Sequence, residues 1–459
     1  MAILPSPKIR QKVKIVLYPL LLSGFLLFSC APSLKYYTKV DEYLLNQEFD
    51  SAWHLSKKNN KAFNKLNAAL YYLDEGILAH FASRYSESNQ SLAKAESIMD
   101  KLYTKSISKH IASFIINDNT IPYRGEDFES ALVNLFMAMN YVALGSLEDA
   151  LVEARKVDNK LNIFNAQYED DKKNVYREDA FIRFLMGVLY EAEGEINDAY
   201  ISYWKAENIY KNDYSRNYAV SPPVFLIENL LTLSRELDFH EEFRDIQNEY
   251  NNILFINPIE KKSLAEIFFI HYNGLGPVKV EAFFPVPMPD NYVVKIAYPE
   301  LKKRRYRISK SKIYLENLST SRSYVFETEL MEDIASIAVM NLKNRINRIK
   351  AKAIVRAIAK YLTAKQAHKA ARRHGGELLE LLAKAATQAV NWASEQADVR
   401  HWRLLPAEIR VGRTLIPPGE YKGQIDFVDS NRAVVISKQI QNFTLTKREK
   451  KFFMFRTVN

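Results

Sequence analysis

The sequence predicts an α+β protein, in which an N-terminal α-solenoid of helical hairpins is followed by a C-terminal domain of mixed strands and helices. Glycine is scarce, with 13 in 459 residues, which favours helix over a β-rich fold. Between residues 138 and 203, small residues and glycines recur at one spacing. After residue 257, short β-branched and aromatic runs bounded by turn residues predict strands. A hydrophobic fraction of 47% excludes global disorder.

Residues 1–29 are predicted to be a secretion signal. A leader with four positive charges precedes 14 uncharged, mostly apolar residues, from Ile15 to Phe28. This run is too short to cross a bilayer core of about 30 Å comfortably. A charged leader, a short apolar run and a small residue at its end, here Ser29, are together typical of a secretory signal.

Cys30 is the only cysteine, so the sequence allows neither an intramolecular disulfide nor a cysteine-rich zinc site. The stretch Leu27-Phe28-Ser29-Cys30 resembles a lipobox, the cleavage site of bacterial lipoproteins, although a smaller residue is usual where Phe28 stands. The resemblance implies cleavage before Cys30, acylation of this residue, and a lipidated tether over residues 30–38. Two or more acyl chains anchor a protein stably. The alternative is a plain secretory signal or an uncleaved anchor.

Residues 39–254 are predicted to form four or five helical hairpins. Two segments share one spacing of small residue, tyrosine, glycine, aliphatic residue and alanine: Ala138, Tyr141, Gly145, Leu147 and Ala150, then Gly187, Tyr190, Gly194, Ile196 and Ala199. This pattern resembles the tetratricopeptide repeat, where small residues lie at the contact of two antiparallel helices and the glycine opens the turn between them. A third set, with Ser83 at the turn, fits less well. An ordinary helical bundle is the alternative.

Residues 255–459 are predicted to form an α+β domain. Its expected strands lie on both sides of a helical insertion over residues 331–400, which Gly375 and Gly376 divide in two. The prolines in FFPVPMPD, residues 283–290, cannot donate ladder hydrogen bonds and predict a sheet edge or a loop. The expected strands are Glu266 to Tyr272, Val278 to Phe284, Tyr292 to Ala297, Tyr306 to Ile308, Tyr324 to Thr328, Ala407 to Val411, Tyr421 to Val428, Ala433 to Gln441 and Lys451 to Thr457.

The insertion is strongly basic, with eleven lysines and arginines and no acidic residue from Ile334 to Gly376. Five of these cations recur every three or four residues and should share one helix stripe: Arg345, Arg348, Lys352, Arg356 and Lys360. Apolar residues beside them, among them Ala353, Ala357, Ile354, Ile358 and Leu362, make the helix amphipathic. Such a helix can lie on an anionic membrane surface or bind an acidic partner. The alternative is a solvated face whose apolar side packs on the strands, and no nucleic-acid partner is expected.

Catalytic and metal-binding patterns are absent from the sequence. None of the eight histidines belongs to an HExxH motif or a ligand cluster, and there is no GxSxG elbow. The turn NGLGP, residues 273–277, lacks the spacing and the lysine of a phosphate-binding loop, and a strand is expected after it. No cofactor, no metal and no enzymatic activity are therefore predicted.

The chain as a whole resembles a family of bacterial tetratricopeptide-repeat lipoproteins. The likeness rests on the lipobox, the repeats around Gly145 and Gly194, the NGLGP turn, the stretch ADVRHWRLLP over residues 397–406, and PPGEY over residues 417–421. It implies an exported, lipid-anchored protein, and some members of that family occur alongside lipoproteins that regulate cell-wall synthesis. Within ADVRHWRLLP, Asp398, Arg400 and Trp402 predict either a structural corner or a ligand site.

The function predicted from these observations is that of a lipid-anchored, periplasm-facing scaffold that binds a partner protein in the groove of its helical repeats. Candidate groove residues lie on first helices of the hairpins: Tyr72, Asn134, Tyr141, Arg183 and Tyr190. The alternative is an envelope enzyme, or an activator of a cell-wall enzyme, that acts through the C-terminal domain, with His401 and Asp398 as the residues to test. Ala31 after the cysteine favours the outer membrane over the inner one, because an aspartate there would favour retention at the inner membrane.

Overall fold

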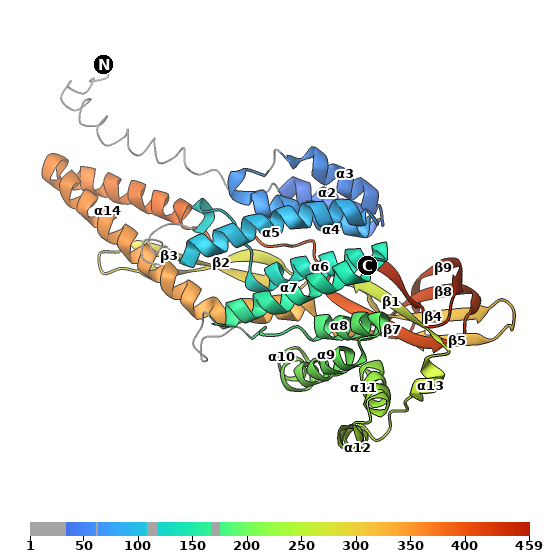
Figure 1. Ribbon diagram of the computed structural model, residues 1–459. Coiled ribbons are helices and arrows are strands. Elements are labelled where there is room, and N and C mark those ends of the chain that lie inside the picture. The colour runs from blue at the N-terminus through green and yellow to red at the C-terminus, as the bar shows by residue number, and fades with distance from the viewer. Residues whose placement is uncertain (1–33, 61–62, 108–117, 167–174) are drawn as a thin grey trace.

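A computed structural model describes residues 34–60, 63–107, 118–166 and 175–459. Cys30, the predicted signal and the first residues of the predicted tether lie outside this range. A helical part is followed by a strand-rich part, and a long helical hairpin, α14 (Ile334–Ser394), projects from one end of the molecule (Figure 1). The predicted α+β class, a helical-repeat solenoid followed by a mixed domain, is confirmed.

The helices of the first part pair in the predicted order. Three antiparallel hairpins carry the repeat pattern, and shorter helices flank them on both sides. The helices are α2 (Leu34–Leu45), α3 (Phe49–Lys58), α4 (Ala68–Phe81), α5 (Tyr85–Ile107), α6 (Asp127–Leu144), α7 (Leu147–Ala166), α8 (Ala180–Glu193), α9 (Ile196–Ile209), α10 (Ser215–Tyr218), α11 (Val224–Glu236), α12 (His240–Glu249) and α13 (Pro258–Lys261).

The turn and contact residues of the repeats have the predicted roles. Gly145 and Gly194 end α6 and α8 in the left-handed conformation, with φ of 77° and 82°, which glycine adopts without steric cost. Ser83, at the corresponding turn between α4 and α5, takes a φ of 58°. At the helix contacts, a Cβ on Gly187 would collide with the Tyr203 ring. The small residues therefore let the paired helices approach closely.

The strands form three sheets. The first has the order β10-β1-β7-β6, with β1 and β10 parallel; the second is the ribbon β2-β3; the third has the order β5-β4-β8-β9. The helix α14 stands between β6 and β7, where the insertion is expected. The strands are β1 (Ala265–Asn273), β2 (Val278–Pro287), β3 (Val293–Lys302), β4 (Ile308–Asn317), β5 (Ser323–Glu327), β6 (Glu329–Glu332), β7 (Glu408–Ile416), β8 (Gly419–Asp429), β9 (Val434–Leu445) and β10 (Lys450–Thr457).

Several boundaries differ from the sequence-based expectation. The strand expected at Tyr306 to Ile308 ends where β4 begins, and β6 was not expected. Pro285 and Pro287 lie inside β2, which pairs only with β3. The free edge of this ribbon accommodates the prolines, as the edge prediction requires. Gly376, with φ of 72° and ψ of −164°, interrupts α14 and turns it into a hairpin.

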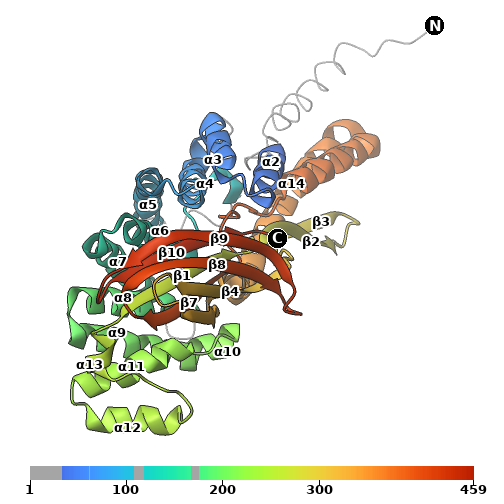
Figure 2. The same cartoon turned by 90° about the vertical axis from the view of Figure 1, so that its right-hand side faces the viewer.

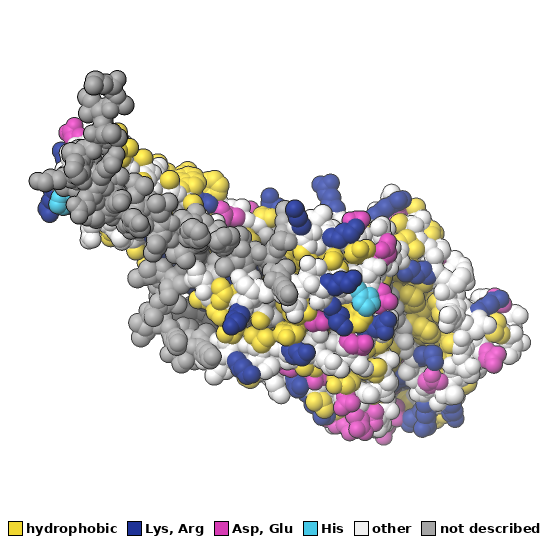
Figure 3. Space-filling view, turned by 90° about the horizontal axis from the view of Figure 1, so that it is seen from above, with side chains coloured by type: hydrophobic (Ala, Val, Ile, Leu, Met, Phe, Trp, Pro, Cys, Tyr) yellow, Lys and Arg dark blue, Asp and Glu magenta, His cyan; other side chains and the backbone are white. Residues whose placement is uncertain are grey.

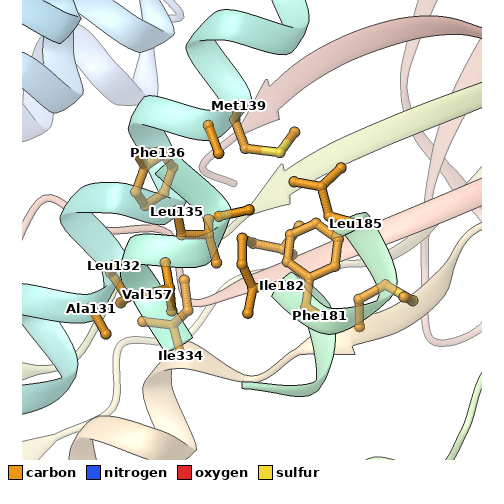
Figure 4. Close-up of a cluster of buried hydrophobic side chains, with 14 of the residues drawn as sticks. Ala131, Leu132, Leu135, Phe136, Met139, Val157, Phe181, Ile182, Leu185 and Ile334 are labelled. Carbon is orange, nitrogen blue, oxygen red and sulfur yellow. The ribbon is translucent and has the colours of Figure 1, made fainter. Parts of the chain in front are cut away.

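The central strand β1 is buried along its whole length because both of its faces are covered. Phe268, Ile270 and Tyr272 belong to the core shared with the repeat helices, whereas Ile267 and Phe269 face the third sheet. The helices curve around the sheet in Figure 2. Figure 4 shows side chains of α6 and α8, among them Leu135, Phe136 and Leu185, converging with Ile334 at the start of α14. The repeats and the strand-rich part therefore share one core.

Candidate functional site

The predicted groove residues lie at contacts within the repeat array. Asn134 is fully buried and donates hydrogen bonds to Glu96 of α5, at 2.9 Å, and to Glu153 of α7, at 2.6 Å. Arg183 is buried and forms an ion pair with Asp158 of α7, at 2.5 Å. These two side chains hold first helices to the second helices beside them.

The three tyrosines among the predicted groove residues, Tyr72, Tyr141 and Tyr190, also make contacts within the chain. The Tyr190 hydroxyl accepts a hydrogen bond from Arg155 of α7, at 2.8 Å. Lys94 of α5 lies 5.4 Å from the centre of the Tyr72 ring. Tyr141 is half-buried against the core. As a correction, the five residues lie on first helices as expected, but Asn134, Arg183 and Tyr190 are buried, so this set does not line an open groove.

The face that the first helices turn inward packs on the first sheet of the same chain. Tyr272 of β1 contacts His80 and Phe136, with ring centres 5.0 and 5.7 Å apart. The ring centre of Phe184 of α8 lies 6.3 Å from that of Phe268 of β1. The concave surface that such arrays usually offer to a partner is thus occupied by the strand-rich part of the protein.

Buried ion pairs reinforce this contact. Arg413 of β7 bonds Glu266 of β1 at 2.6 Å and Glu228 of α11 at 2.7 Å. Lys450 of β10 pairs with Glu191 of α8 at 3.4 Å, and Lys261 of α13 pairs with the same carboxylate. Removing one partner of such a network leaves a buried charge uncompensated, which costs about 3–5 kcal/mol. These pairs therefore tie the sheet to the helices at defined positions.

The hairpin α14 has two arms, arm 1 (residues 334–375) and arm 2 (residues 377–394). They lie antiparallel, because Lys360 bonds Ser394 at 3.1 Å, His368 bonds Thr387 at 2.6 Å, and Arg372 bonds Glu380 at 3.4 Å. The ribbon β2-β3 packs along arm 1 and contacts arm 2. The far end of the hairpin extends beyond this support (Figure 1).

The predicted cationic stripe is largely engaged inside the chain. Arg356 and Lys360 bond Glu395 at 2.6 and 2.8 Å, and Arg345 pairs with Glu126. The five cations share one helix face, as their spacing predicts, but that face lies against arm 2 and the repeats. Arg356 is only 4% exposed, so it cannot contact an external surface. Arg348 is exposed and Lys352 half-buried, and both have contacts of their own.

A cleft of about 240 Å³ lies at the root of the hairpin, between arm 1, the segment 121–126 that precedes α6, and residues 396–400. Its walls carry more cations than carboxylates, but Lys279 and Arg345 both pair with Glu126. Burial alone would raise the pKa of Glu126; the charges of Arg345 and Lys279 overcome this and hold it well below its usual range. The ionised carboxylate therefore links the hairpin, the ribbon and the repeats.

The ADVRHWRLLP stretch forms the structural corner that was one of its two expected roles. Arg400 bonds Asp398 at 2.7 Å and donates to the Ile121 carbonyl at 3.0 Å, and Trp402 is 2% exposed. Burial, with Lys279 nearby, lowers the pKa of His401 to about 3. The neutral imidazole lies against the backbone oxygens of residues 277 and 399. His401 and Asp398 thus have structural partners, and their geometry gives the alternative enzymatic role no support.

The large side chains exposed on the hairpin form two outer faces. On arm 2, Leu378, Leu381 and Leu382 are 71%, 64% and 58% exposed. On arm 1, small residues such as Ala353 and Ala357 are buried against the ribbon, while large aliphatic residues face solvent: Ile354, Val355, Ile358 and Leu362. Hydrophobic side chains gather along the projecting hairpin in Figure 3. The sequence places these residues on the two helices of the insertion, but it does not reveal which apolar side the ribbon covers.

Among the residues that the structure describes, no three His, Cys, Asp or Glu side chains are grouped so that they could hold a metal ion. Within the same ranges, no helix combines the length and the apolar character that a bilayer crossing requires.

Comparison with known proteins yields no family. The chain matches no known protein family and no curated protein. Similar solved structures include apo RapI (14% identity, 48% of this chain and 72% of that one, TM-score 0.31) and BtubC from P. vanneervenii (11%, 54% and 91%, 0.33). MamA of AMB-1 is similar at 13% identity over 48% of this chain and 98% of that one, with a TM-score of 0.28. At these scores the likeness supports no argument, and the helical-repeat architecture rests on the hairpins themselves.

Proposed function

We propose that this protein is a lipid-anchored scaffold of the bacterial cell envelope that faces the periplasm and holds a partner protein on the outer face of arm 2. The proposal keeps the predicted scaffold role but moves the partner from the groove of the repeats to the hairpin. The groove is occupied by the protein's own sheet, so a partner needs another surface. The observation that supports arm 2 is its run of large, exposed apolar side chains.

These side chains belong to one apolar stripe. At about 100° per residue, the three leucines and Trp392 lie on one side of the helix, and the smaller Ala385 and Ala389 fill the stripe between them. Trp392, 36% exposed, lies 5.9 Å from Phe283 of β2, which extends the stripe onto the ribbon. Contiguous exposed apolar surface of this kind marks interaction sites, and tryptophan is enriched at their centres. A partner helix with an apolar side fits such a stripe.

The anchor and the location are supported by the sequence alone. The charged leader, the apolar run and the lipobox-like stretch before Cys30 favour export and acylation. Ala31 favours the outer membrane, with the inner membrane as the alternative. On this proposal the partner is an envelope protein, and the resemblance to lipoprotein families connects it with cell-wall synthesis.

Site-specific photo-crosslinking in living cells tests the partner surface. A photoreactive amino acid is placed at Leu382 of arm 2 and, as a control, at Val325 of β5, which is 54% exposed near the opposite end of the molecule. We expect one defined adduct from position 382, none from 325, and loss of the adduct when Leu378→Ser and Trp392→Ser are added. Equal adducts at both positions, or no adduct at 382, would contradict the proposal. Palmitate labelling that persists in Cys30→Ser would contradict the anchor.

A further inference from the structure

We infer that the outer face of arm 1 is a contact surface for an anionic lipid bilayer. This face consists of four aliphatic residues followed by three cations: Ile354, Val355, Ile358, Leu362, Lys365, Lys369 and Arg373. The inference goes beyond the proposed function, since it concerns the other arm of the hairpin and requires no partner protein there.

The distribution of side-chain size on arm 1 is the first observation. Ala353, Ala357 and Ala364 are buried against the ribbon, whereas Val355 and Leu362 are 51% and 54% exposed. A helix that only needs to pack on its own domain would bury its larger aliphatic side chains, because burial of apolar area is favourable. Arm 1 follows this rule at its root, where Ile334 and Ile337 are buried, but does the reverse over residues 353–364. Its exposed face therefore suits surroundings less polar than water.

The orientation of this face leaves it accessible. Two positions along an α-helix differ by about 200°, so Ile358 points away from both Arg356 and Lys360, which hold Glu395 beside arm 2. The ribbon contacts Ala357 and Tyr361 on another side of the helix. The exposed aliphatic side chains consequently turn away from both neighbours of arm 1.

The charged residues that arm 1 places on this face are all cations, and the carboxylates that border it, Glu377 and Glu380, belong to arm 2 and pair with Arg372. Lys365 and Lys369, seven and eleven positions after Ile358, lie within about 20° of its direction around the helix. No carboxylate among the described residues pairs with Lys369 or Arg373. Over residues 334–376 arm 1 has no acidic side chain at all. This separates arm 1 from arm 2, where Glu377 and Glu380 accompany the leucines.

A bilayer fits both properties together. An interfacial helix inserts aliphatic side chains at the boundary of head groups and acyl chains, and its lysines extend their ammonium groups to the head groups. Anionic lipids attract such cations in a salt-dependent way. The described residues of this face form an exposed helix surface. The combination therefore favours a lipid surface over an acidic protein.

A fluorescent probe placed on this face tests the inference. Cys30 is the only cysteine, so a full-length Cys30→Ser chain can receive a single environment-sensitive label at Ile358→Cys. A matched chain carries the label at Val325→Cys on β5. Vesicles of phosphatidylglycerol and phosphatidylethanolamine are compared with vesicles of phosphatidylcholine. We expect the label at 358 to report an apolar environment on the anionic vesicles only, and the label at 325 to remain in water.

Charge reversal on this face provides a second, independent test. The variant K365E/K369E/R373E should bind the anionic vesicles about a hundredfold more weakly, at roughly fivefold for each lost cation. The control R322E/R432E/K447E makes the same change of net charge on exposed residues near the other end of the molecule and should bind normally. Circular dichroism confirms that both variants are folded.

Three results would overturn the inference: a label at 358 that stays in water on anionic vesicles, equal weakening by the control reversal, or an equally large response to soluble polyglutamate. The last result would indicate an acidic protein instead. Because the assay contains no partner protein and does not change arm 2, its outcome is independent of the crosslinking test at Leu382.

Discussion

The first helices of the repeats and the hairpin α14 are both helical and apolar, but they present their large side chains in opposite directions. In α6, Phe136 is fully buried against β1 and Trp402. In arm 2 of α14, Leu378 is 71% exposed. The inward surface of the repeats is thus used for cohesion within the chain, whereas the insertion leaves large apolar side chains exposed.

The largest expected effect tests the buried side of the comparison. Phe136→Ala should lower the free energy of unfolding by about 3–5 kcal/mol, because it removes a fully buried ring and leaves a cavity between α6 and β1. Urea unfolding followed by circular dichroism measures this loss. If the repeats and the sheet share one core, the helical and the strand-rich parts should unfold in a single transition. A loss below about 1 kcal/mol would mean that the groove is not closed as described.

The same inward face should make stability depend on pH through Asp74 of α4. Burial raises the pKa of Asp74 to about 8, against the hydrogen bond from Tyr37, at 2.9 Å, and the charge of Arg403, which lower it. As the pH rises through about 4, the ordinary pKa of an aspartate, the Asp74 carboxyl loses its proton in the unfolded chain but keeps it in the folded protein. The stabilising contribution is thus complete below about pH 4 and is lost as pH rises towards 8.

Asp74→Asn provides the measurement. The variant should lack this dependence, so the wild-type stability should fall relative to it by at most about 1.4 kcal/mol per pH unit between pH 5 and 8. Tyr37→Phe, which keeps Asp74, should retain the direction of the slope. Parallel curves for wild type and Asp74→Asn would show that this carboxyl is ionised and solvated in the folded protein. The inward face would then be wetter than the burial of α4 indicates.

The sequence was informative where local rules determine structure and silent where tertiary contacts do. The spacing around Gly145 and Gly194 predicted the hairpins, because a left-handed turn and a close helix contact restrict residue type locally. The spacing of Asn134 and Arg183 placed them on first helices. It did not show that β1, more than 70 residues further along the chain, covers the inward side of those helices.

The hairpin shows the same limit. The apolar positions of α14 predicted an amphipathic helix, and Gly375 and Gly376 predicted the break within it. The basic stripe was expected to be exposed because nothing in the local pattern points to Glu395 or Glu126 as partners. The choice between Ala357 and Ile358 as the buried position depends on where the ribbon β2-β3 lies, a non-local contact that single-sequence periodicity does not contain.

The smallest expected effect completes the comparison from its exposed side. The double variant Leu381→Ser/Leu382→Ser removes two large apolar side chains, whereas Phe136→Ala removes one. Both leucines, however, are more than half exposed. The free energy of unfolding should therefore change by no more than about 0.5 kcal/mol. Measured in the same urea assay, a loss comparable to that of Phe136→Ala would mean that these leucines stabilise the fold. If the variant is stable but has lost the crosslink at arm 2, the two leucines contribute to binding and not to folding. This is the expected result, because the hairpin is held in place by its buried alanines and its ion pairs.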